Sequence, residues 1–258
     1  MSVVFACVAA LLASALTLFS GFGLGTLLMP VFSLFFPVPL AIAATAIVHL
    51  ANNLFKLALV GRHADRGALI RFAVPAAIAA LAGAGLLTLV ANWPPWFTWH
   101  VADETYAVKP VKTLIGGLII VFAVLEFSPA VGRLALPPRY LMAGGLLSGF
   151  FGGLSGNQGA LRSAFLIKAG LSKEAFIGTG VVAAVMVDLV RLTVYGLSLP
   201  AALFETPVLG IVGPATLSAF LGAWLGARLM TKVTMRSIQI VVAVFLMLVG
   251  AGLATGLL

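Results

Sequence analysis

Two stretches of this chain repeat one layout of apolar segments and glycines. Residues 20–60 superpose on residues 154–194 with a constant offset of 134 positions. Each copy reads as an apolar segment, a glycine-rich break, a short apolar segment ended by a turn, and a long apolar segment with embedded polar residues. Weak internal repetition of this kind is found in membrane folds built from two inverted halves. The identical pairs are Gly25 and Gly159, Leu27 and Leu161, Ala41 and Ala175, Thr45 and Thr179, Val48 and Val182, and Val60 and Val194.

The composition places the whole chain in lipid. Hydrophobic residues make up 62% of the 258 residues and charged residues 9%, whereas soluble domains have roughly 45–50% and 25%. Several apolar segments are near the roughly 20 residues that a helix needs to cross a bilayer, and together they use up the sequence. We therefore expect one membrane transport domain over residues 1–258, with a first repeat at about 1–127 and a second at about 139–258.

The expected fold is an all-α integral membrane bundle of two inverted repeats. Segments 23–36 and 157–169 have only 14 and 13 residues, roughly 20 Å of helix, which is short for a bilayer. Each repeat would therefore hold a short broken or re-entrant helix pair plus three full spans. The apolar segments are 2–20, 23–36, 38–60, 68–91, 110–127, 139–153, 157–169, 173–196, 207–229 and 237–257.

Loop charges orient this bundle, because Lys and Arg are enriched in cytoplasmic loops. Loop 92–107 carries aromatic and acidic residues instead, as expected of an outer interface. We therefore expect both termini outside, with segment 38–60 running inward and segment 173–196 running outward, so that the two copies are antiparallel. The basic residues that assign loops to the cytoplasm are Arg62 and Arg66, Arg133 and Arg139, and Lys232 and Arg236.

The two glycine-rich breaks, at residues 21–25 and 152–159, are the candidate binding site. Broken backbone inside a membrane is tolerated only where it is buried in protein or lines a wet cavity, so the breaks should meet near the midplane. Helix N-termini carry unsatisfied N–H groups and a partial positive charge, and two of them facing one cavity would bind an anion. The alternative is that these glycines only allow close helix packing.

The pattern around the breaks resembles the sulfite exporter TauE/SafE family, also called the TSUP family. The resemblance covers nearly the whole chain. It implies a transporter of small sulfur-containing or organic anions, such as sulfite or a sulfonate like sulfoacetate. The family usually has consecutive glycines at the second break, where this chain has Asn157 and Gln158. The matching motifs are Gly23-x-Gly25, Pro30 and Ala41-x-x-x-Thr45 in the first copy, and Gly156-x-x-Gly159 and Ala175-x-x-x-Thr179 in the second.

Polar residues embedded in the apolar segments complete the site. Ionisable groups at this depth cost at least about 2.5 kcal/mol each against lipid, so they should face a cavity or a partner. The substrate-binding candidates are Gly23, Gly25, Thr45, Asn52, Asn53, Asn157, Gln158, Gly159, Arg162 and Thr179. The coupling or ion-pair candidates are His49, Lys56, Asp188 and Arg191.

Each ionisable candidate also has a purely structural interpretation. Asp188 and Arg191 could form an i,i+3 pair that only joins the bundle, and His49 could be a buried, hydrogen-bonded histidine. Lys56 could extend to the cytoplasmic interface. Arg162 either pairs with Asp188 or holds an anion through its bidentate guanidinium.

The expected function is a secondary transporter of a small sulfur-containing or organic anion in the bacterial inner membrane, working by alternating access. No nucleotide-binding signature occurs in the sequence, so a gradient or a separate partner must drive transport. Protons are the candidate, through Asp188 or through His49, whose unperturbed pKa is about 6.5. The alternatives are an anion channel, in which the breaks form a filter, and a cation or metal transporter.

Other classes of protein fit the sequence poorly. The three histidines are scattered without metal-ligand spacing, and Ser155 lacks the G-x-S-x-G frame, so we expect no enzyme, no metal site and no cofactor. The few basic residues form no patch for nucleic acid. The expected partners are a small anion and the lipid bilayer, and a homodimer is compatible with the sequence. The direction of transport stays open.

The expected orientation is testable by cysteine labelling in whole cells, on a Cys7→Ala background. Ala64→Cys should resist an impermeant thiol reagent added outside, because its loop is cytoplasmic. Ala102→Cys should react, because its loop is external. Labelling after permeabilisation controls for accessibility, and reaction at position 64 without reaction at position 102 would reverse the orientation.

Overall fold

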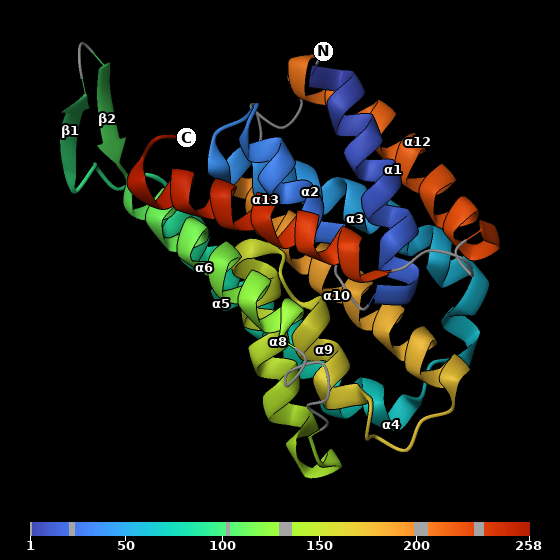
Figure 1. Cartoon of the computed structure of the whole chain (residues 1–258). Coiled ribbons are helices and arrows are strands. Elements are labelled where there is room, and N and C mark those ends of the chain that lie inside the picture. Colours follow the sequence, from blue (N-terminus) through green and yellow to red (C-terminus); the bar gives the residue numbers. More distant parts are fainter. Residues whose placement is uncertain (1, 21–23, 102–103, 129–135, 199–205, 230–234) are drawn as a thin grey trace.

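The computed structural model describes residues 2–20, 24–101, 104–128, 136–198, 206–229 and 235–258. The predicted all-α membrane bundle is confirmed, since helices make up nearly all of these ranges (Figure 1). Part of the first break, Gly21 to Gly23, lies outside the described residues, as do Arg133 and Lys232 of two loops whose charges oriented the bundle.

The helices follow the predicted apolar segments closely. The first half contains α1 (Ser2–Ser20), α2 (Leu24–Ser33), α3 (Val38–Val60), the turn η1 (Gly61–His63), α4 (Arg66–Ala68), the π-helical η2 (Leu69–Ala73), α5 (Val74–Ala91) and α6 (Pro110–Phe127). The second half contains η3 (Pro138–Tyr140), α8 (Leu141–Ser155), α9 (Gly159–Leu166), α10 (Lys173–Ser198), α12 (Thr206–Leu229) and α13 (Met235–Thr255).

Among the described residues, four helical stretches are long and apolar enough to cross a membrane. They are Val38–His63, Arg66–Ala91, Lys173–Ser198 and Val208–Leu225. Shorter apolar helices lie in α1, α2, α6 and α13. Figure 1 shows both ends of the chain toward one end of the bundle and α4 at the opposite end. The side of the membrane on which the two termini lie stays a prediction.

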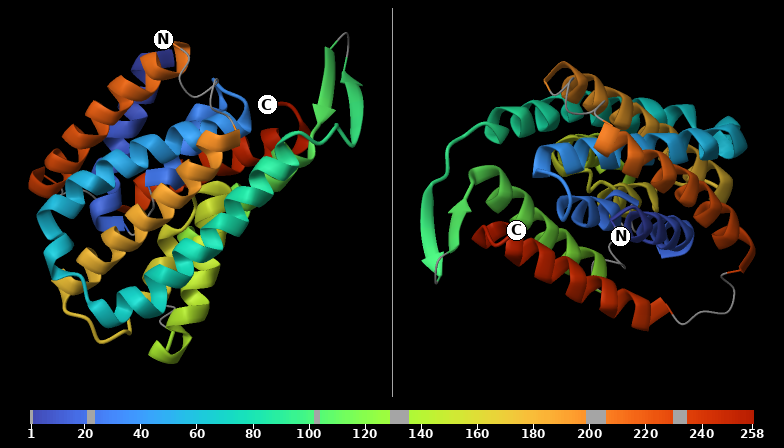
Figure 2. Two further views of the ribbon diagram at one scale, coloured as in Figure 1. Left: turned by 180° about the vertical axis from the view of Figure 1, so that it is seen from behind. Right: turned by 90° about the horizontal axis from the view of Figure 1, so that it is seen from above.

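Helices of one half pack mainly against helices of the other half. In sequence order α1, α2, α3, α5 and α6 correspond to α8, α9, α10, α12 and α13. The closest pairs are α5 with α8, α1 with α12, α6 with α13 and α3 with α10. Replacing each helix by its counterpart in the other half gives the same four pairs: α5 with α8 becomes α12 with α1, and the pairs α6–α13 and α3–α10 map onto themselves. The views in Figure 2 show these pairs side by side from two further directions.

A strip of glycines on α8 permits the close approach of α5 and η2. A Cβ atom on Gly145, Gly149 or Gly153 would overlap the backbone of Phe72, Ala76 or Ala80, respectively. Both sets are spaced by four residues, so they form one ridge on each helix. Small residues at helix contacts are typical of membrane bundles, where close backbone packing replaces the hydrophobic driving force. For Gly153, which belongs to the second break, the packing interpretation is therefore correct.

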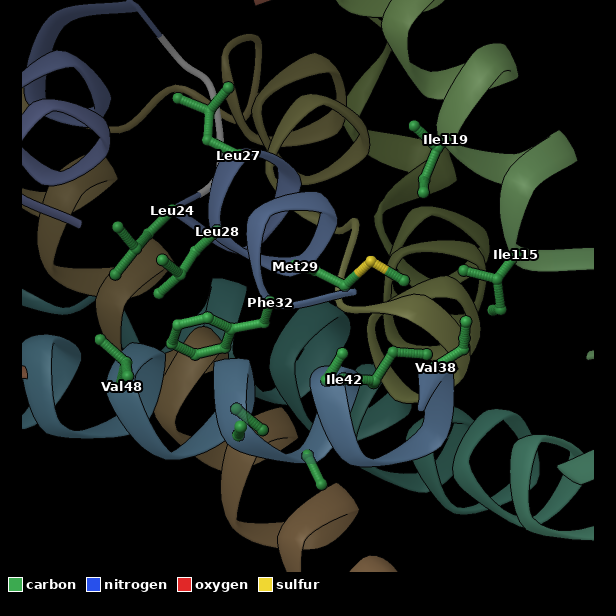
Figure 3. Packing of buried hydrophobic residues seen from close by; sticks show 14 of the residues in the cluster. Leu24, Leu27, Leu28, Met29, Phe32, Val38, Ile42, Val48, Ile115 and Ile119 are labelled. Atoms are coloured by element: carbon green, nitrogen blue, oxygen red, sulfur yellow. The ribbon is translucent and has the colours of Figure 1, made fainter. Parts of the chain in front are cut away.

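The short helix α2 is enclosed by protein. Every residue from Leu24 to Phe32 is buried, and Figure 3 shows Leu28, Met29 and Phe32 packed among side chains of α3 and α6. Its ten residues span about 15 Å at the helical rise. Such a helix cannot cross a bilayer, and enclosure protects its ends from lipid. The prediction of a short helix after the first break is confirmed.

Loop 92–107, which the sequence predicts only as an aromatic external loop, contains a β-hairpin. Strands β1 (Phe97–Val101) and β2 (Glu104–Val108) pair antiparallel and project from the bundle near the C-terminus (Figure 1). Trp99 stacks on Tyr106 with ring centroids 4.8 Å apart, and its Nε1 donates to the Thr255 carbonyl at 2.8 Å. Aromatic and β-branched residues on both sides of a two-residue connection were the available signal.

The glycine strip on α8 predicts that adding one methyl group to it lowers the thermal stability of the protein. Gly149→Ala places a Cβ atom in the backbone of Ala76, and overpacking of this kind costs about 1–3 kcal/mol. Gly85→Ala is the matched control, because a Cβ atom there meets no atom within 4 Å and alanine favours helix. We expect thermal unfolding in detergent to show a lower Tm for the first variant only. Equal Tm values for both variants would contradict the tight α5–α8 contact.

Candidate functional site

The two glycine-rich breaks meet in the structure. A Cβ atom on Gly25, in the first turn of α2, would lie 2.9 Å from the carbonyl oxygen of Gly156, in the turn between α8 and α9. Gly156 has a φ of 82°, the left-handed conformation that ends many helices and that glycine adopts without strain. Glycine is thus required at both positions of this contact. Gly25 lacks the Cβ atom for which there is no space, and Gly156 adopts the left-handed backbone conformation.

Two side chains of α10 hold the end of α8 at this contact. Arg191 Nη1 donates to the Gly152 carbonyl at 3.4 Å, and the Tyr195 hydroxyl donates to the Gly153 carbonyl. The C-terminal end of a helix carries a partial negative charge, and the Gly152 carbonyl also accepts from the backbone N–H of Gly156 at 3.0 Å. A guanidinium cation and a hydroxyl donor are therefore well matched to this position. The break is positioned by α10 as well as by its own glycines.

Arg191 also forms a buried ion pair that reaches α3. Its Nε lies 2.9 Å and its Nη2 2.7 Å from Asp188 Oδ1. The other carboxylate oxygen, Asp188 Oδ2, lies 2.6 Å from His49 Nδ1. Asp188 and Arg191 are fully buried and His49 is almost so. The cluster of these three side chains, the His49–Asp188–Arg191 cluster, joins the middles of the two long helices.

The hydrogen bonds assign a role to each nitrogen of His49. Because Nδ1 faces a carboxylate oxygen, it carries the proton and donates to Asp188. Nε2 is then the acceptor in a neutral ring. Asn53 Nδ2 lies 3.1 Å from Nδ1 and 3.3 Å from Nε2, and since Nδ1 carries the proton, this amide can donate only to Nε2. This tautomer is inferred from the contacts. With neutral His49, the carboxylate of Asp188 is balanced by the guanidinium of Arg191, and the cluster has no net charge.

Several of the candidate side chains have buried polar atoms without a hydrogen-bond partner in the described part of the chain. Three of these atoms are N–H donors: Asn52 Nδ2, Gln158 Nε2 and Arg162 Nη1. The hydroxyl oxygen of Thr45 also has no hydrogen-bond partner in that part of the chain. Buried polar groups nearly always have a partner, and one left unpaired costs about 1–3 kcal/mol. Three N–H donors without an acceptor, drawn from both halves of the chain, favour a ligand that accepts hydrogen bonds.

The remaining candidates divide between the break and other places. Asn157 and Gly159 are buried in the turn that begins α9. The Thr179 hydroxyl accepts from the backbone N–H of Asp65 at 2.9 Å, so it joins the start of α10 to the loop after α3. Lys56 is half-buried on α3. Gly23 lies outside the described residues.

Two residues that support the break were not singled out from the sequence. Ser148 Oγ donates to the Gln158 carbonyl at 3.2 Å and ties α8 to the residue before α9. Tyr195 follows Arg191 by four residues, so both lie on one face of α10. That spacing could have identified Tyr195 beside Asp188 and Arg191. Ser148 offered no signal, because its partner is a backbone atom on a different element.

The sequence left two roles for Arg162, an ion pair with Asp188 or contact with an anion, and the structure does not contain the ion pair. Arg162 makes no ion pair with Asp188 within 4.0 Å; the partners of that carboxylate are Arg191 and His49. Among the described residues, no cluster of three or more His, Cys, Asp or Glu side chains could hold a metal ion.

Comparison with known proteins agrees with this architecture. The family model described as "Sulfite exporter TauE/SafE" matches residues 6–253. No match was found among curated proteins or among solved structures. The matched range includes both breaks and the His49–Asp188–Arg191 cluster, so the chain is a membrane protein that belongs to the TauE/SafE family of sulfite exporters.

Proposed function

We propose that this protein is a secondary transporter that carries a small sulfur oxyanion or organic anion across the bacterial inner membrane by alternating access. The observation that supports this most directly is the unpaired donor Gln158 Nε2 at the second break, together with two further unpaired donors on α3 and α9, Asn52 Nδ2 and Arg162 Nη1. Sulfite, sulfonates and carboxylates offer only acceptor oxygens. Such an anion, bound where Gly25 meets Gly156, would give Gln158 Nε2 the partner it lacks.

Local charge favours an anion over a cation at this place. The one carboxylate near the breaks, Asp188, is engaged on both oxygens by Arg191 and His49. A dehydrated cation would find no free carboxylate here among the described residues, and carboxylates are preferred ligands of such cations. The N-terminal end of α9, which begins at Gly159, adds free backbone N–H groups and a partial positive charge.

The pairing of helices supports a mechanism in which two halves move against each other. We propose that residues 1–127 and 139–258 are inverted repeats, because α5 with α8 and α1 with α12 are equivalent pairs, and α3 with α10 is its own equivalent. Rocking of two such halves about a central site is a common form of alternating access. The meeting breaks would then lie at the pivot.

Anion binding and the contact between the breaks can be tested together. In detergent, sulfite and sulfonates should raise the Tm of the protein, since a ligand that binds only the native state stabilises it. Gly25→Ala should weaken this binding by about tenfold or more, because its Cβ atom would lie 2.9 Å from the Gly156 oxygen. Gly117→Ala, with no atom within 4 Å of its Cβ, is the matched control. Uptake of sulfite into proteoliposomes should follow the same order.

These measurements also separate the transporter from the alternatives. A transporter shows saturable uptake and accelerated exchange when substrate is present on both sides, whereas a channel shows neither. No Tm change with any sulfur or carboxylate anion, together with a change on adding Na⁺ or a divalent cation, would refute an anion carrier and favour a cation carrier.

We further propose that protons are coupled to transport through His49. Asp188 is held by Arg191 at 2.7 Å, and a carboxylate in such an ion pair is a poor proton carrier at neutral pH. His49 can accept a second proton at Nε2, where only Asn53 is bound. Protonation would add a positive charge beside the anion site. Release of that proton would reverse the effect.

The proton proposal predicts a specific loss. His49→Gln should abolish the stimulation of sulfite uptake by an imposed pH gradient while leaving downhill exchange within about threefold of wild type. His100→Gln, on the projecting hairpin, should retain full stimulation. If His49→Gln proteoliposomes still respond to the gradient as wild type does, His49 is not the coupling residue.

A further inference from the structure

Two cationic side chains, Lys56 and Arg162, lie on the side of the His49–Asp188–Arg191 cluster toward α4. Lys56 follows His49 by seven residues, two helical turns, so it lies on the same face of α3, the face that packs on α10. At 1.5 Å per residue it lies about 10 Å from His49 along the helix. The end of α3 beyond it packs on the start of α10, since a Cβ atom on Gly178 would be 2.7 Å from the Val60 oxygen.

Arg162 lies at nearly the same depth. Its Nε would be 3.5 Å from a Cβ atom on Gly180 of α10, and Gly180 precedes Asp188 by eight residues, about 12 Å along the helix. The guanidinium therefore lies across α10 at the level that Lys56 reaches from α3. Both cations therefore lie on the side of the cluster toward α4, where α3 and α9 each pack on α10.

Neither cation has a charge partner among the side chains that the structure describes. The ion pairs within 4.0 Å there are those of Asp188 with His49 and Arg191. Arg162 Nη1 is buried without a hydrogen bond. Asp65 caps the start of α4 instead, and Glu174 is exposed at the start of α10. Two like charges at the same depth repel each other, and an anion between them would remove this repulsion.

We propose that Lys56 and Arg162 form a second anion subsite, which selects oxyanions with two negative charges. The inference rests on the proposed function and gives it a substrate class. Each charge on a bound anion interacts with both cations, and the Coulomb energy scales with the charge of the anion. The glycine breaks offer neutral donors and a partial charge, which serve singly and doubly charged anions alike. Lys56 and Arg162 would therefore add a preference for the doubly charged ones.

Sulfate and methanesulfonate are suitable probes, because both present oxygens on a tetrahedral sulfur but carry two charges and one charge. Binding to the full-length protein in detergent is measured by the concentration dependence of Tm. Lys56→Gln should weaken sulfate binding by about tenfold and methanesulfonate binding by only about threefold, since the lost Coulomb energy is half as large. Lys56→Arg should restore sulfate binding. Lys168→Gln, an exposed cation just beyond α9, should change neither.

Arg162→Gln should show the same inequality between the two anions, and the double variant should show less than the sum of the two single effects if one sulfate contacts both cations. Equal weakening of both anions in Lys56→Gln, or no weakening of sulfate, would overturn the subsite. Wild-type protein that binds methanesulfonate but not sulfate would also overturn it while leaving the proposed function intact. Wild-type protein that binds neither probe, nor sulfite, would refute both.

Discussion

The ion pair between Asp188 and Arg191 is the interaction on which the rest of the structure depends. A buried carboxylate and a buried guanidinium are each strongly unfavourable alone, so each requires the other in place. Asp188 extends the pair to His49 on α3, and Arg191 extends it to the Gly152 carbonyl at the end of α8. One neutral cluster thereby holds two long helices and one break in register. Removing either charge would leave the other uncompensated at the centre of the bundle.

Glycine acts in two distinct ways around this cluster. On α8 it forms a flat strip, where any side chain would overlap the backbone of α5 or η2. In the breaks it permits a contact between Gly25 and Gly156 and a left-handed turn at Gly156. The strip serves cohesion, since helices in lipid associate through close packing. The break contact exposes helix ends to a common point, which is where we propose that the anion binds.

The distribution of charge explains how such a site can attract an anion inside a membrane. The His49–Asp188–Arg191 cluster has no net charge while His49 is neutral, so its carboxylate does not repel a bound anion. Unpaired donors at the breaks, such as Gln158 Nε2, offer hydrogen bonds. Lys56 and Arg162 add positive charge toward the end of the bundle where α4 lies. Protonation of His49 would strengthen attraction at the centre, which gives a physical basis for coupling to protons.

The sequence by itself determined the membrane class, the helix boundaries, the short helices after the breaks and the family, because these follow from local hydrophobicity, glycine motifs and segment length. It also identified Asp188, Arg191 and His49 as buried polar residues. Only the tertiary structure decided that Asp188 bonds to His49 as well as Arg191, that Thr179 contacts Asp65, and that Tyr195 caps α8. These partners lie far apart in the chain, and helical spacing reveals a shared face but not what that face meets. The hairpin at residues 97–108 was missed because its pairing depends on hydrogen bonds between strands, and its aromatic residues suit a membrane interface equally well.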